Sequence, residues 1–319
     1  GRCCASPRFF DDFYATFLAS SPAIREKFAR TDMTAQKQLL RAGILNLGIE
    51  GTMLIGALSG FLGAYWTGNL WAGVLAGMLA GILFGLLMGF MSITVKANQV
   101  VAGLGITILG GGLSTLLFRL AFGLRTTPPT LDIFPTLPIP LLSRIPWIGP
   151  ILFEHNVLVY LALALVPVAS LVLYRTHFGL KVRAVGESPD AADTRGIRVE
   201  LIRYLCLMIG GAMAGIGGSY LVLGSLGLFW TQMTAGRGFI AVAVVVFSKW
   251  DPARALLGAW VFGLASAVQI SLQTLSVPIP SEILLMLPYI ITVIVLVGVS
   301  RRAEFPGAFA VPYYRGGKE

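Results

Sequence analysis

Long apolar stretches alternate with short polar ones along most of this chain, and these stretches set the expected architecture. An α-helix needs about 20 mostly apolar residues to cross roughly 30 Å of hydrocarbon. Windows of about this length predict eight spans, at about 43–66, 70–95, 99–123, 156–174, 204–226, 237–248, 254–274 and 283–299. The pattern therefore predicts an all-α, polytopic membrane protein.

The sixth window, 237–248, is the shortest of the eight. The residues before it, 228–233, read Leu-Phe-Trp-Thr-Gln-Met and would lengthen it if they enter the membrane. Irregular backbone is tolerated at membrane depth only where protein or a water-filled cavity surrounds it. We therefore expect 228–233 to extend this crossing or to form a re-entrant piece.

One charged segment, residues 175–203, interrupts the apolar pattern. It carries six basic and four acidic side chains. Charges at this density are too costly to place in lipid without strong compensation. The segment must therefore lie outside the bilayer, and it is the first place to look for a contact with another protein.

Within that segment, the sequence predicts a short helix at 189–195 with both ends specified. Such a helix is either a docking surface for another protein or a surface turn without a partner. The capping signals are Ser188 as N-cap, Pro189 in the first turn, Asp190 at the positive end of the helix dipole, Arg195 at the negative end, and Gly196 as a left-handed stop.

Composition and charge agree with a membrane protein and indicate its orientation. The 319 residues are 56% hydrophobic and 12% charged, with a mean hydropathy of +0.80. The basic residues behind the net charge of +9 flank the apolar windows and form no continuous patch, so we expect no nucleic-acid partner. Placing both ends of the span set in the cytoplasm puts 20 of the 24 lysines and arginines there, as the positive-inside rule requires.

Few residues could carry catalysis. His155 and His177 are the two histidines of the chain, so a histidine-based metal site or catalytic triad has almost nothing to be built from. Cys3, Cys4 and Cys206 have no metal-ligand spacing and indicate no disulfide framework. The chain also lacks a phosphate-binding P-loop motif. We therefore expect no enzyme, no metal site and no cofactor, and any ATP hydrolysis would take place in another chain.

Glycines recur at four-residue spacing inside the windows. Small residues at this spacing let helix backbones approach closely in lipid. We expect them to pack helices and not to contact a solute directly. The residues are Gly73, Gly77, Gly81, Gly85 and Gly89 in one window, and Gly210, Gly211, Gly215, Gly217 and Gly218 in another.

A few polar residues lie in apolar surroundings. Asn46 and Glu50 are four apart and would share a face if the first window is helical from its start. A carboxylate at membrane depth usually faces a pathway or an ionic partner, here Arg237, although an interfacial, structural position is the alternative. Amides suit a neutral hydroxylated or heterocyclic solute, or bond helix to helix. The candidates for a solute pathway are Asn46, Glu50, Asn98, Gln99, Gln232, Arg237 and Gln269.

Five motifs, in order along the chain, resemble those of bacterial ABC-importer permeases. The branch is the branched-chain amino acid and simple sugar permease superfamily, and within it the motifs are most similar to those of nucleoside or simple sugar permeases. The motifs are GILNLGIEG at 43–51, ANQVVAG at 97–103, AVGESP at 184–189 with Gly196-Ile197 after it, GRGFIA at 236–241 and LPY at 287–289.

This resemblance implies a translocation subunit in the lipid of a bacterial inner or plasma membrane, moving a nucleoside or a related neutral solute such as a simple sugar. The implied partners are a second permease subunit, like or unlike this one, cytoplasmic ABC ATPase domains and an extracytoplasmic substrate-binding lipoprotein. The resemblance also assigns 186–197 as the loop that contacts the ATPase. Its coupling residues are Gly186, Glu187, Ser188, Pro189, Asp190, Ala191, Ala192, Asp193, Arg195 and Gly196.

The ends of the chain differ from the apolar middle. Residues 1–42 are amphipathic, and their segments FFDDFY at 9–14 and SPAIREKF at 21–28 resemble the first helices of a bacterial single-domain globin. Members of the permease family normally have another span before the first motif. We therefore expect a truncated or chimeric N-terminus, a transmembrane domain at 43–300 and a cytoplasmic tail at 301–319.

Two other functions remain open from the residues alone. A standalone secondary transporter or channel would work without ATP, but the buried ionisable pairs typical of an ion route are sparse here. A membrane-anchored haem sensor would use residues 1–42, although no histidine lies there to hold the iron.

Overall fold

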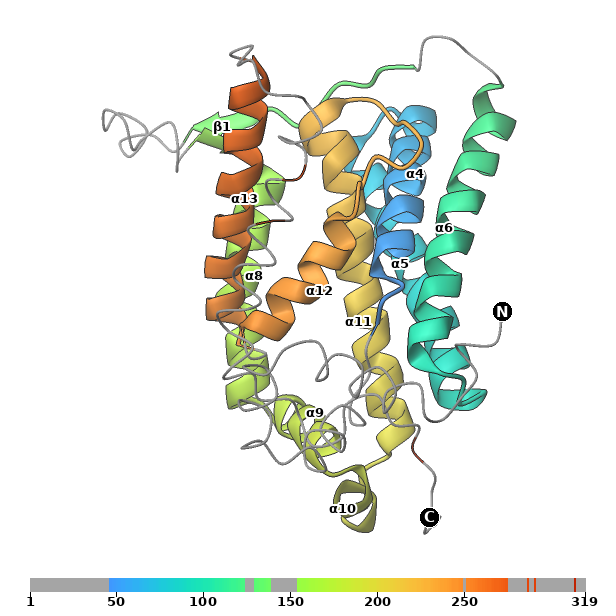
Figure 1. The fold of residues 1–319 in the computed structure, drawn as a ribbon, viewed down its shortest axis with the longest axis vertical. Helices are drawn as coiled ribbons and strands as arrows, with labels where there is room; N and C mark the ends of the chain where they lie inside the picture. Colours follow the sequence, from blue (N-terminus) through green and yellow to red (C-terminus); the bar gives the residue numbers. More distant parts are fainter. Residues whose placement is uncertain are drawn as a thin grey trace, which may run out of the picture.

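The computed structural model describes residues 46–123, 129–138, 154–248 and 251–274, together with Met286, Ile290 and Tyr313. Within these ranges most of the backbone is helical (Figure 1). The segment at 1–42, most of the predicted span at 283–299 and most of the tail at 301–319 lie outside the described residues.

In the described part of the chain, six long helices form a bundle, and shorter elements connect them. The long helices are α4 (Ile49–Thr67), α5 (Leu70–Gly89), α6 (Gln99–Phe122), α8 (Val157–Arg175), α11 (Val199–Tyr220) and α13 (Pro252–Thr274). The shorter helices are η1 (Phe90–Thr94), α9 (His177–Glu187), α10 (Pro189–Thr194), η2 (Leu221–Leu226) and α12 (Arg237–Phe247), and the strands β1 (Thr136–Pro138) and β2 (Glu154–Asn156) pair antiparallel.

From α4 to α11 successive long helices run in alternating directions, whereas α13 runs in the same direction as α11, and the bundle has two distinct ends (Figure 1). At one end α6, α11 and α13 begin and α8 stops, and α9 and α10 lie there as well. Lys96, Arg175 and Arg254 flank these helix ends, and we call this end the basic end. β1 and β2 lie toward the opposite end. The folded chain thus gathers its cationic connections on one side.

The described helices account for most of the predicted spans. Five helical stretches in this part of the chain are long and apolar enough to cross a membrane, and each overlaps a predicted window. The chain is therefore an all-α polytopic membrane protein. The total of eight spans stays a prediction, since α12 has only 11 residues. The five stretches are Leu70–Thr94, Gln99–Phe122, Val157–Arg175, Val199–Leu226 and Pro252–Gln273.

The helix α4 begins later than the first apolar window. Residues 46–48 are not helical, and the Asn46 side-chain oxygen accepts a hydrogen bond from the Gly48 amide at 3.0 Å. Such a local side-chain turn competes with helix formation. The Thr107 hydroxyl donates to the Leu47 carbonyl at 3.0 Å and so fixes this segment to α6. Asn46 and Glu50 therefore do not share a helical face, and that prediction was wrong.

Glycines bring α4, α5 and α11 into close contact. A Cβ at Gly81 would lie 2.1 Å from the carbonyl oxygen of Gly211, and a Cβ at Gly215 would lie 2.1 Å from that of Gly77. On α4, a Cβ at Gly56 would lie 2.5 Å from the Cα of Gly215. The prediction that the spaced glycines pack helices is confirmed for Gly77, Gly81, Gly211 and Gly215, where a side chain would force the backbones apart, but not for Gly210, where a Cβ would meet nothing within 4 Å.

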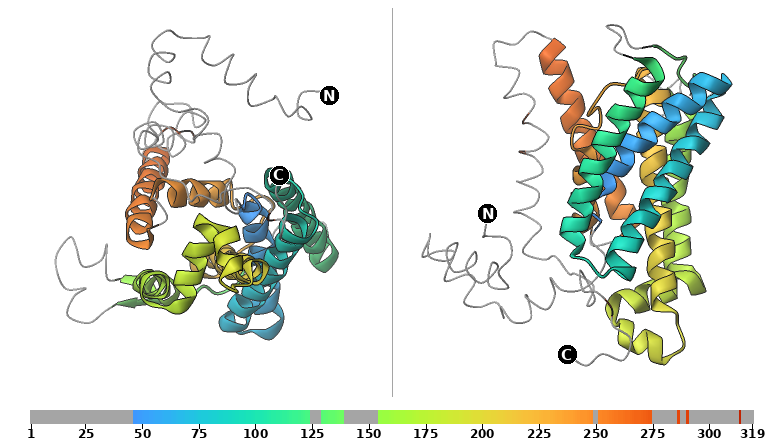
Figure 2. Two further views of the ribbon diagram at one scale, coloured as in Figure 1. Left: turned by 90° about the horizontal axis from the view of Figure 1, so that it is seen from below. Right: turned by 90° about the vertical axis from the view of Figure 1, so that its right-hand side faces the viewer.

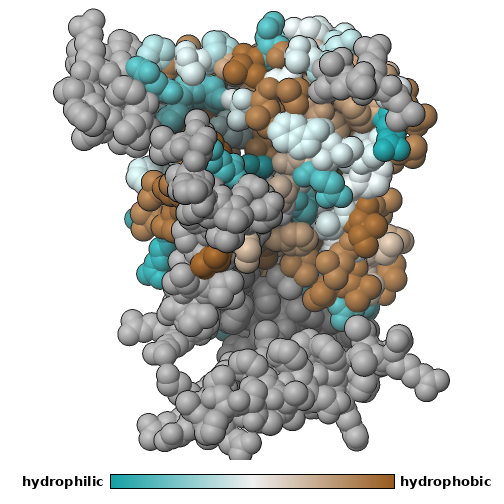
Figure 3. Space-filling view, turned by 45° about the horizontal axis from the view of Figure 1, so that its top comes forward, coloured by the Kyte–Doolittle hydropathy of each residue, from teal (hydrophilic) through white to brown (hydrophobic). Residues whose placement is uncertain are grey.

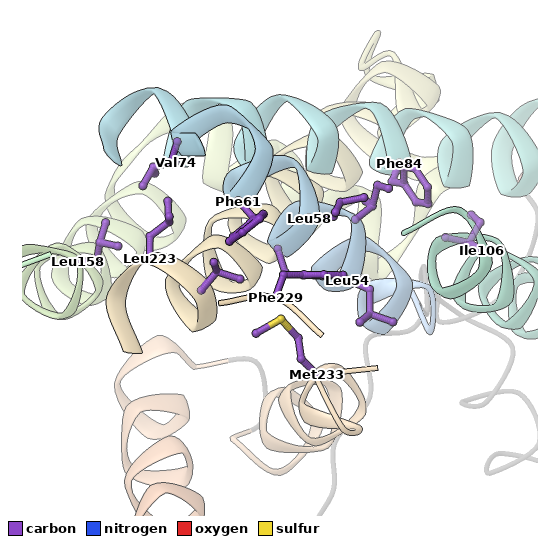
Figure 4. Close-up of a cluster of buried hydrophobic side chains, with 14 of the residues drawn as sticks. Leu54, Leu58, Phe61, Val74, Phe84, Ile106, Leu158, Leu223, Phe229 and Met233 are labelled. Carbon is purple, nitrogen blue, oxygen red and sulfur yellow. The ribbon is translucent and has the colours of Figure 1, made fainter. Parts of the chain in front are cut away.

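The segment between η2 and α12 is irregular, and part of it is buried in the core. Phe229 and Met233 are 0% and 1% exposed, and the Phe229 ring lies 5.1 Å from that of Phe118 between centroids. Figure 4 shows Phe229 and Met233 beside Leu54 and other residues of α4. Protein therefore surrounds much of this non-helical stretch, as irregular backbone at membrane depth requires.

The sixth window is only partly helical. Residues 227–236 form turns and irregular backbone, and α12 then runs obliquely from the middle of the bundle toward the end where α13 begins (Figure 1). Residues 228–233 thus lead into α12 as irregular backbone, and an extended crossing and a re-entrant piece both stay predictions.

The outward faces of the bundle are apolar. Figure 2 shows α8 and α13 on the side of the bundle away from α5 and α6. On α13, Leu257 and Leu264 are 64% and 68% exposed, and on α8 Leu171 is 58% exposed. Brown, hydrophobic residues also cover large parts of the surface in Figure 3. This surface suits contact with hydrocarbon.

Candidate functional site

The Glu50 carboxylate lies where the first turn of α4 meets the start of α12. One oxygen, Oε1, accepts a hydrogen bond from the Gly236 amide at 2.8 Å, and Oε2 accepts one from the Gly238 amide at 2.6 Å. The Thr234 hydroxyl also donates to Oε1. Glu50 is only 6% exposed. We call this arrangement of Glu50, Thr234, Gly236 and Gly238 the Glu50 clamp.

The Glu50 clamp stabilises a buried carboxylate through backbone groups. Amides at the start of a helix lack intrahelical partners and lie at the positive end of the helix dipole, so an anion is favourable there. Each hydrogen bond to a charged group contributes about 1.5–3 kcal/mol. The clamp therefore offsets much of the cost of burying the charge.

Arg237 is not the ionic partner of Glu50. Its guanidinium donates from Nη1 to the Met233 carbonyl at 3.0 Å, although its own backbone lies between the two glycine amides that bind the carboxylate. Within residues 46–123 and 154–248 no ion pair joins Glu50 and Arg237. The predicted pairing was wrong because the carboxylate is already satisfied by the backbone on either side of Arg237.

The turn at 231–236 adopts left-handed backbone at three positions. Gln232 has φ 64°, Ala235 has φ 44° and Gly236 has φ 79°. Such conformations cost a residue with a side chain about 1–2 kcal/mol and are concentrated at functional sites. Gly238 is required for another reason, since a Cβ there would lie 2.6 Å from the Cα of Glu50.

The Glu50 clamp lies inside the bundle, beside α6 and away from the end of that helix. The residue after Glu50 is Gly51, and a Cβ on it would lie 2.4 Å from the carbonyl oxygen of Ile106 on α6. Ile106 follows the start of α6 at Gln99, which at 1.5 Å per residue corresponds to roughly 10 Å along the helix. If α6 begins at the membrane boundary, this distance is about a third of a hydrocarbon thickness of roughly 30 Å.

Two polar side chains of the turn are exposed at this depth. Gln232 and Arg237 are both exposed, and the Gln232 amide nitrogen lies 3.7 Å from where a Cβ of Gly111 on α6 would be. A guanidinium facing hydrocarbon near the bilayer centre costs at least about 2.5 kcal/mol. The exposed face of the turn therefore needs water, a solute or another protein beside it.

The other candidates for the solute pathway lie elsewhere. Asn98 caps α6 by accepting hydrogen bonds from the amides of Val100 at 2.9 Å and Val101 at 3.3 Å. Gln99 is the first residue of α6 and is 3% exposed. Gln269 is half-buried on α13, a helix that contacts α8 and α12. The structure thus brings together Glu50, Gln232 and Arg237 and places Asn98, Gln99 and Gln269 apart from them.

The sequence reasoning missed the donors that bind Glu50. Thr234 was not a candidate, and the glycines around Arg237 were noted only as part of a motif. The sequence feature that could have indicated them is the glycine on each side of Arg237, because glycine lets a carboxylate approach the backbone closely. In the part of the chain that the structure describes, no group of three His, Cys, Asp or Glu residues is placed to hold a metal ion.

At the basic end, α10 is a short helix with both termini satisfied. The Ser188 hydroxyl accepts a hydrogen bond from the Ala191 amide at 3.4 Å, and Gly196 takes φ 80°. The amide of Ile197 donates to the carbonyl of Ala192 at 3.0 Å, as in a Schellman C-cap. The predicted capped helix is confirmed, with Arg195 as the C-cap and not the last helical residue.

A small hydrophobic core packs α10 against its neighbours. Ala192 is 3% exposed and lies in a cluster with Val185 of α9 and with Val199 and Ile202 of α11. We call these four residues the loop core. Tyr313 packs against the same cluster. On the other face of α10, Asp190 and Ala191 are exposed, as is the C-cap Arg195. A force on that face would reach α9 and α11 directly.

Comparison with known proteins gives a consistent result. Residues 39–296 match the family described as branched-chain amino acid transport system / permease component. The chain is 39% identical over 289 residues to a guanosine ABC transporter permease protein of Bacillus subtilis, covering 86% of this chain and 89% of the relative. It is 43% identical over 240 residues to a putative glucose ABC transporter permease protein of Haloferax volcanii, covering 74% of this chain and 71% of that relative.

A third relative has similar coverage. A nucleoside ABC transporter permease protein of Lactococcus lactis is 35% identical over 286 residues, covering 86% of this chain and 89% of the relative. No solved structure matches the chain. The match to the family begins at residue 39, and these comparisons lend no support to the globin-like resemblance of residues 1–42.

Proposed function

The chain belongs to the branched-chain amino acid transport system permease family, and on this basis we propose that it imports a nucleoside or a simple sugar as the permease subunit of an ATP-driven transporter. A permease component carries the membrane path and leaves ATP hydrolysis to a partner protein. The relatives named for guanosine, nucleosides and glucose each match most of this chain, which supports a neutral, hydroxylated solute.

The proposed assembly follows from the two ends of the bundle. An ABC ATPase would bind at the basic end, and a second permease subunit would lie alongside in the membrane. An extracytoplasmic lipoprotein would deliver the solute at the opposite end. The cationic connections support an orientation with the basic end in the cytoplasm of a bacterial cell and the protein in its inner or plasma membrane. Both ends of the span set, with a transmembrane domain at 43–300, would then be cytoplasmic.

The structural observation that carries this proposal is the packing of α10 against α9 and α11. Its outer face is exposed, and its inner face is locked by Ala192 into the loop core shared with α9 and α11. A rigid, capped element of this kind passes a displacement to the helices beneath it, as hinge and shear movements require. The residues 186–196 would therefore couple ATP binding in the partner to movement of the flanking spans.

The functional proposal is tested by reconstitution with the ATPase and the binding protein of the same system. Proteoliposomes should accumulate labelled guanosine or glucose only with ATP and an ATPase competent for hydrolysis. Uptake that persists without the ATPase would contradict the proposal and indicate a standalone transporter or channel. Uptake of leucine in place of both solutes would contradict the solute class.

The docking role is tested by a charge placed on the outer face of α10. Ala191 is exposed and Ala192 is buried, so Ala191→Glu disturbs the docking surface and leaves the loop core intact. We expect this variant to lose co-purification with the ATPase and ATP-driven uptake. A matched control is Leu137→Glu, at a residue 49% exposed near the opposite end, which should still co-purify. Retention of both activities by Ala191→Glu would overturn the docking role.

A further inference from the structure

The turn before α12 has two faces of opposite character. Phe229, Met233 and Thr234 are buried at 0–1% exposure and face the protein core. Gln232 and Arg237, on the same turn, are exposed. The buried face ties the turn to α4 and α6, and the exposed face presents an amide and a guanidinium.

The depth of the turn excludes lipid as the medium beside that exposed face. The amides of Gly236 and Gly238 bind Glu50, whose neighbour Gly51 packs on α6 roughly 10 Å beyond the start of that helix, so Arg237 lies at a similar depth. Ionisable side chains at membrane depth face a water-filled cavity or the interior of a bundle. Non-helical backbone is likewise tolerated there only against protein or water. Water, a solute or another protein must therefore lie beside this face, and a route for the solute is one arrangement that meets this requirement.

The Glu50 clamp decides which groups remain available on the exposed face. Its carboxylate accepts the amides on both sides of Arg237 and the Thr234 hydroxyl, so the turn is held from α4. Among the described residues, Arg237 donates from Nη1 to the Met233 carbonyl, which leaves further guanidinium donors for another acceptor. Gln232 adds one acceptor and two donors.

We propose that the solute crosses along the exposed face of the turn at 231–237, contacting Gln232 and Arg237, and that Glu50 is the positioning residue that holds this face in place. A donor-only guanidinium beside an amide fits an uncharged solute with several hydroxyl and carbonyl acceptors, such as a sugar ring or a nucleobase. This inference rests on the proposed function, because it needs a solute that the complex transports.

Cysteine accessibility tests the route in the complete transport complex. After replacement of Cys3, Cys4 and Cys206 by serine, Gln232→Cys should react with a water-soluble methanethiosulfonate reagent, and saturating guanosine or glucose should slow the reaction several-fold. Leu264→Cys on the exposed face of α13 and Val245→Cys on α12 are the controls, and both should stay unreactive. An unreactive Gln232→Cys, or a rate that the transported solute leaves unchanged, would overturn the route.

Uptake by the complex shows whether the solute route or the proposed function has failed. If the cysteine-replaced complex takes up neither solute although the original complex does, the test moves to the original complex with the Gln232→Cys change alone. If the original complex takes up neither solute with ATP, the proposed function fails. If uptake is intact and the solute gives no protection at Gln232→Cys, only the route fails.

Variants of the Glu50 clamp test the positioning role. Glu50→Gln places an amide donor against backbone donors, and Thr234→Val removes the hydroxyl. Both should raise the KM for uptake about tenfold, the effect of losing one hydrogen bond to a charged group, in complexes that still bind the ATPase. Thr234→Ser keeps the hydroxyl and should behave as the original protein. A merely structural role would lower the amount of complex and leave KM and the protection of Gln232→Cys unchanged, and that result would overturn the assignment.

Discussion

The backbone amide of Gly238 donates to Oε2 of Glu50 at 2.6 Å, across 188 positions of the sequence. This bond joins the start of α12 to the first turn of α4. Both helices begin here, so the positive ends of two helix dipoles lie beside one carboxylate. Glu50 therefore stabilises the N-terminal ends of two helices inside the bundle with a single charge.

Substitution of Gly238 by alanine should destabilise the protein. The new Cβ would lie 2.6 Å from the Cα of Glu50 and 2.7 Å from its nitrogen, so backbone would have to move. Overpacking of this kind costs about 1–3 kcal/mol, and we expect a lower thermal unfolding midpoint in detergent. The control is Gly263→Ala on α13, where a Cβ meets nothing within 4 Å. Equal midpoints for both variants would contradict the close approach at Gly238.

Adjacent glycines on α11 should respond in opposite directions. A Cβ at Gly211 would lie 2.2 Å from the Gly81 carbonyl oxygen, whereas one at Gly210 would meet nothing within 4 Å. Gly211→Ala should separate α5 from α11 and reduce the yield of folded protein. Gly210→Ala should be neutral or gain up to about 1 kcal/mol from helix propensity. Monodispersity in size-exclusion chromatography distinguishes them, and a folded Gly211→Ala with an unchanged midpoint would refute the glycine contact.

Removal of either cap should loosen α10 without unfolding the bundle. Ser188→Ala removes the acceptor for the Ala191 amide, and Gly196→Ala places a side chain at φ 80°. Each change costs about 1 kcal/mol, which corresponds to roughly fivefold faster amide hydrogen exchange through local opening. Exchange should rise in residues 189–197 and remain unchanged in α5. Protection that stays at its original level in both variants would show that the loop core alone holds α10.

Asn156 should contribute through two separate hydrogen bonds. Its amide nitrogen donates to the Gly224 carbonyl in η2 at 2.7 Å, and its oxygen accepts from the Val159 amide at 3.2 Å as the cap of α8. Asn156→Ser keeps a capping oxygen and loses the longer reach, so we expect a loss of about 1 kcal/mol, and roughly twice that for Asn156→Ala. Thermal unfolding measures both, and equal losses would mean that only one of the two bonds matters.

Local signals predicted the parts of this protein whose contacts are local. The capped helix at 189–194 depends on Ser188, Pro189 and Gly196, all within one short stretch, and the structure reproduces each role. By contrast, the start of α4 was placed too early, because apolar content cannot reveal that the Asn46 side chain satisfies the Gly48 amide. Hydropathy reports where a chain prefers lipid and not where its first helical turn begins.

At the candidate site, too, the sequence indicated the residues but not the contacts between them. Glu50, Gln232 and Arg237 were candidates from residue type, but their relation was predicted as an ion pair. The structure instead joins Glu50 to the amides around Arg237. Every residue except proline carries a backbone N–H donor, so sequence patterns give little indication of which of them will bind a carboxylate.

The sequence by itself determined the class of this protein, the approximate position of its described spans, the glycine faces that pack them and the capped helix α10. Each of these depends on composition, periodicity or neighbours a few residues apart. Only the tertiary structure decided that irregular backbone at 227–236 leads into α12, that Glu50 binds the start of α12 and that Ala192 is buried while Ala191 is exposed. These features arise from contacts between segments far apart in the chain, where close packing and hydrogen-bond geometry select one arrangement.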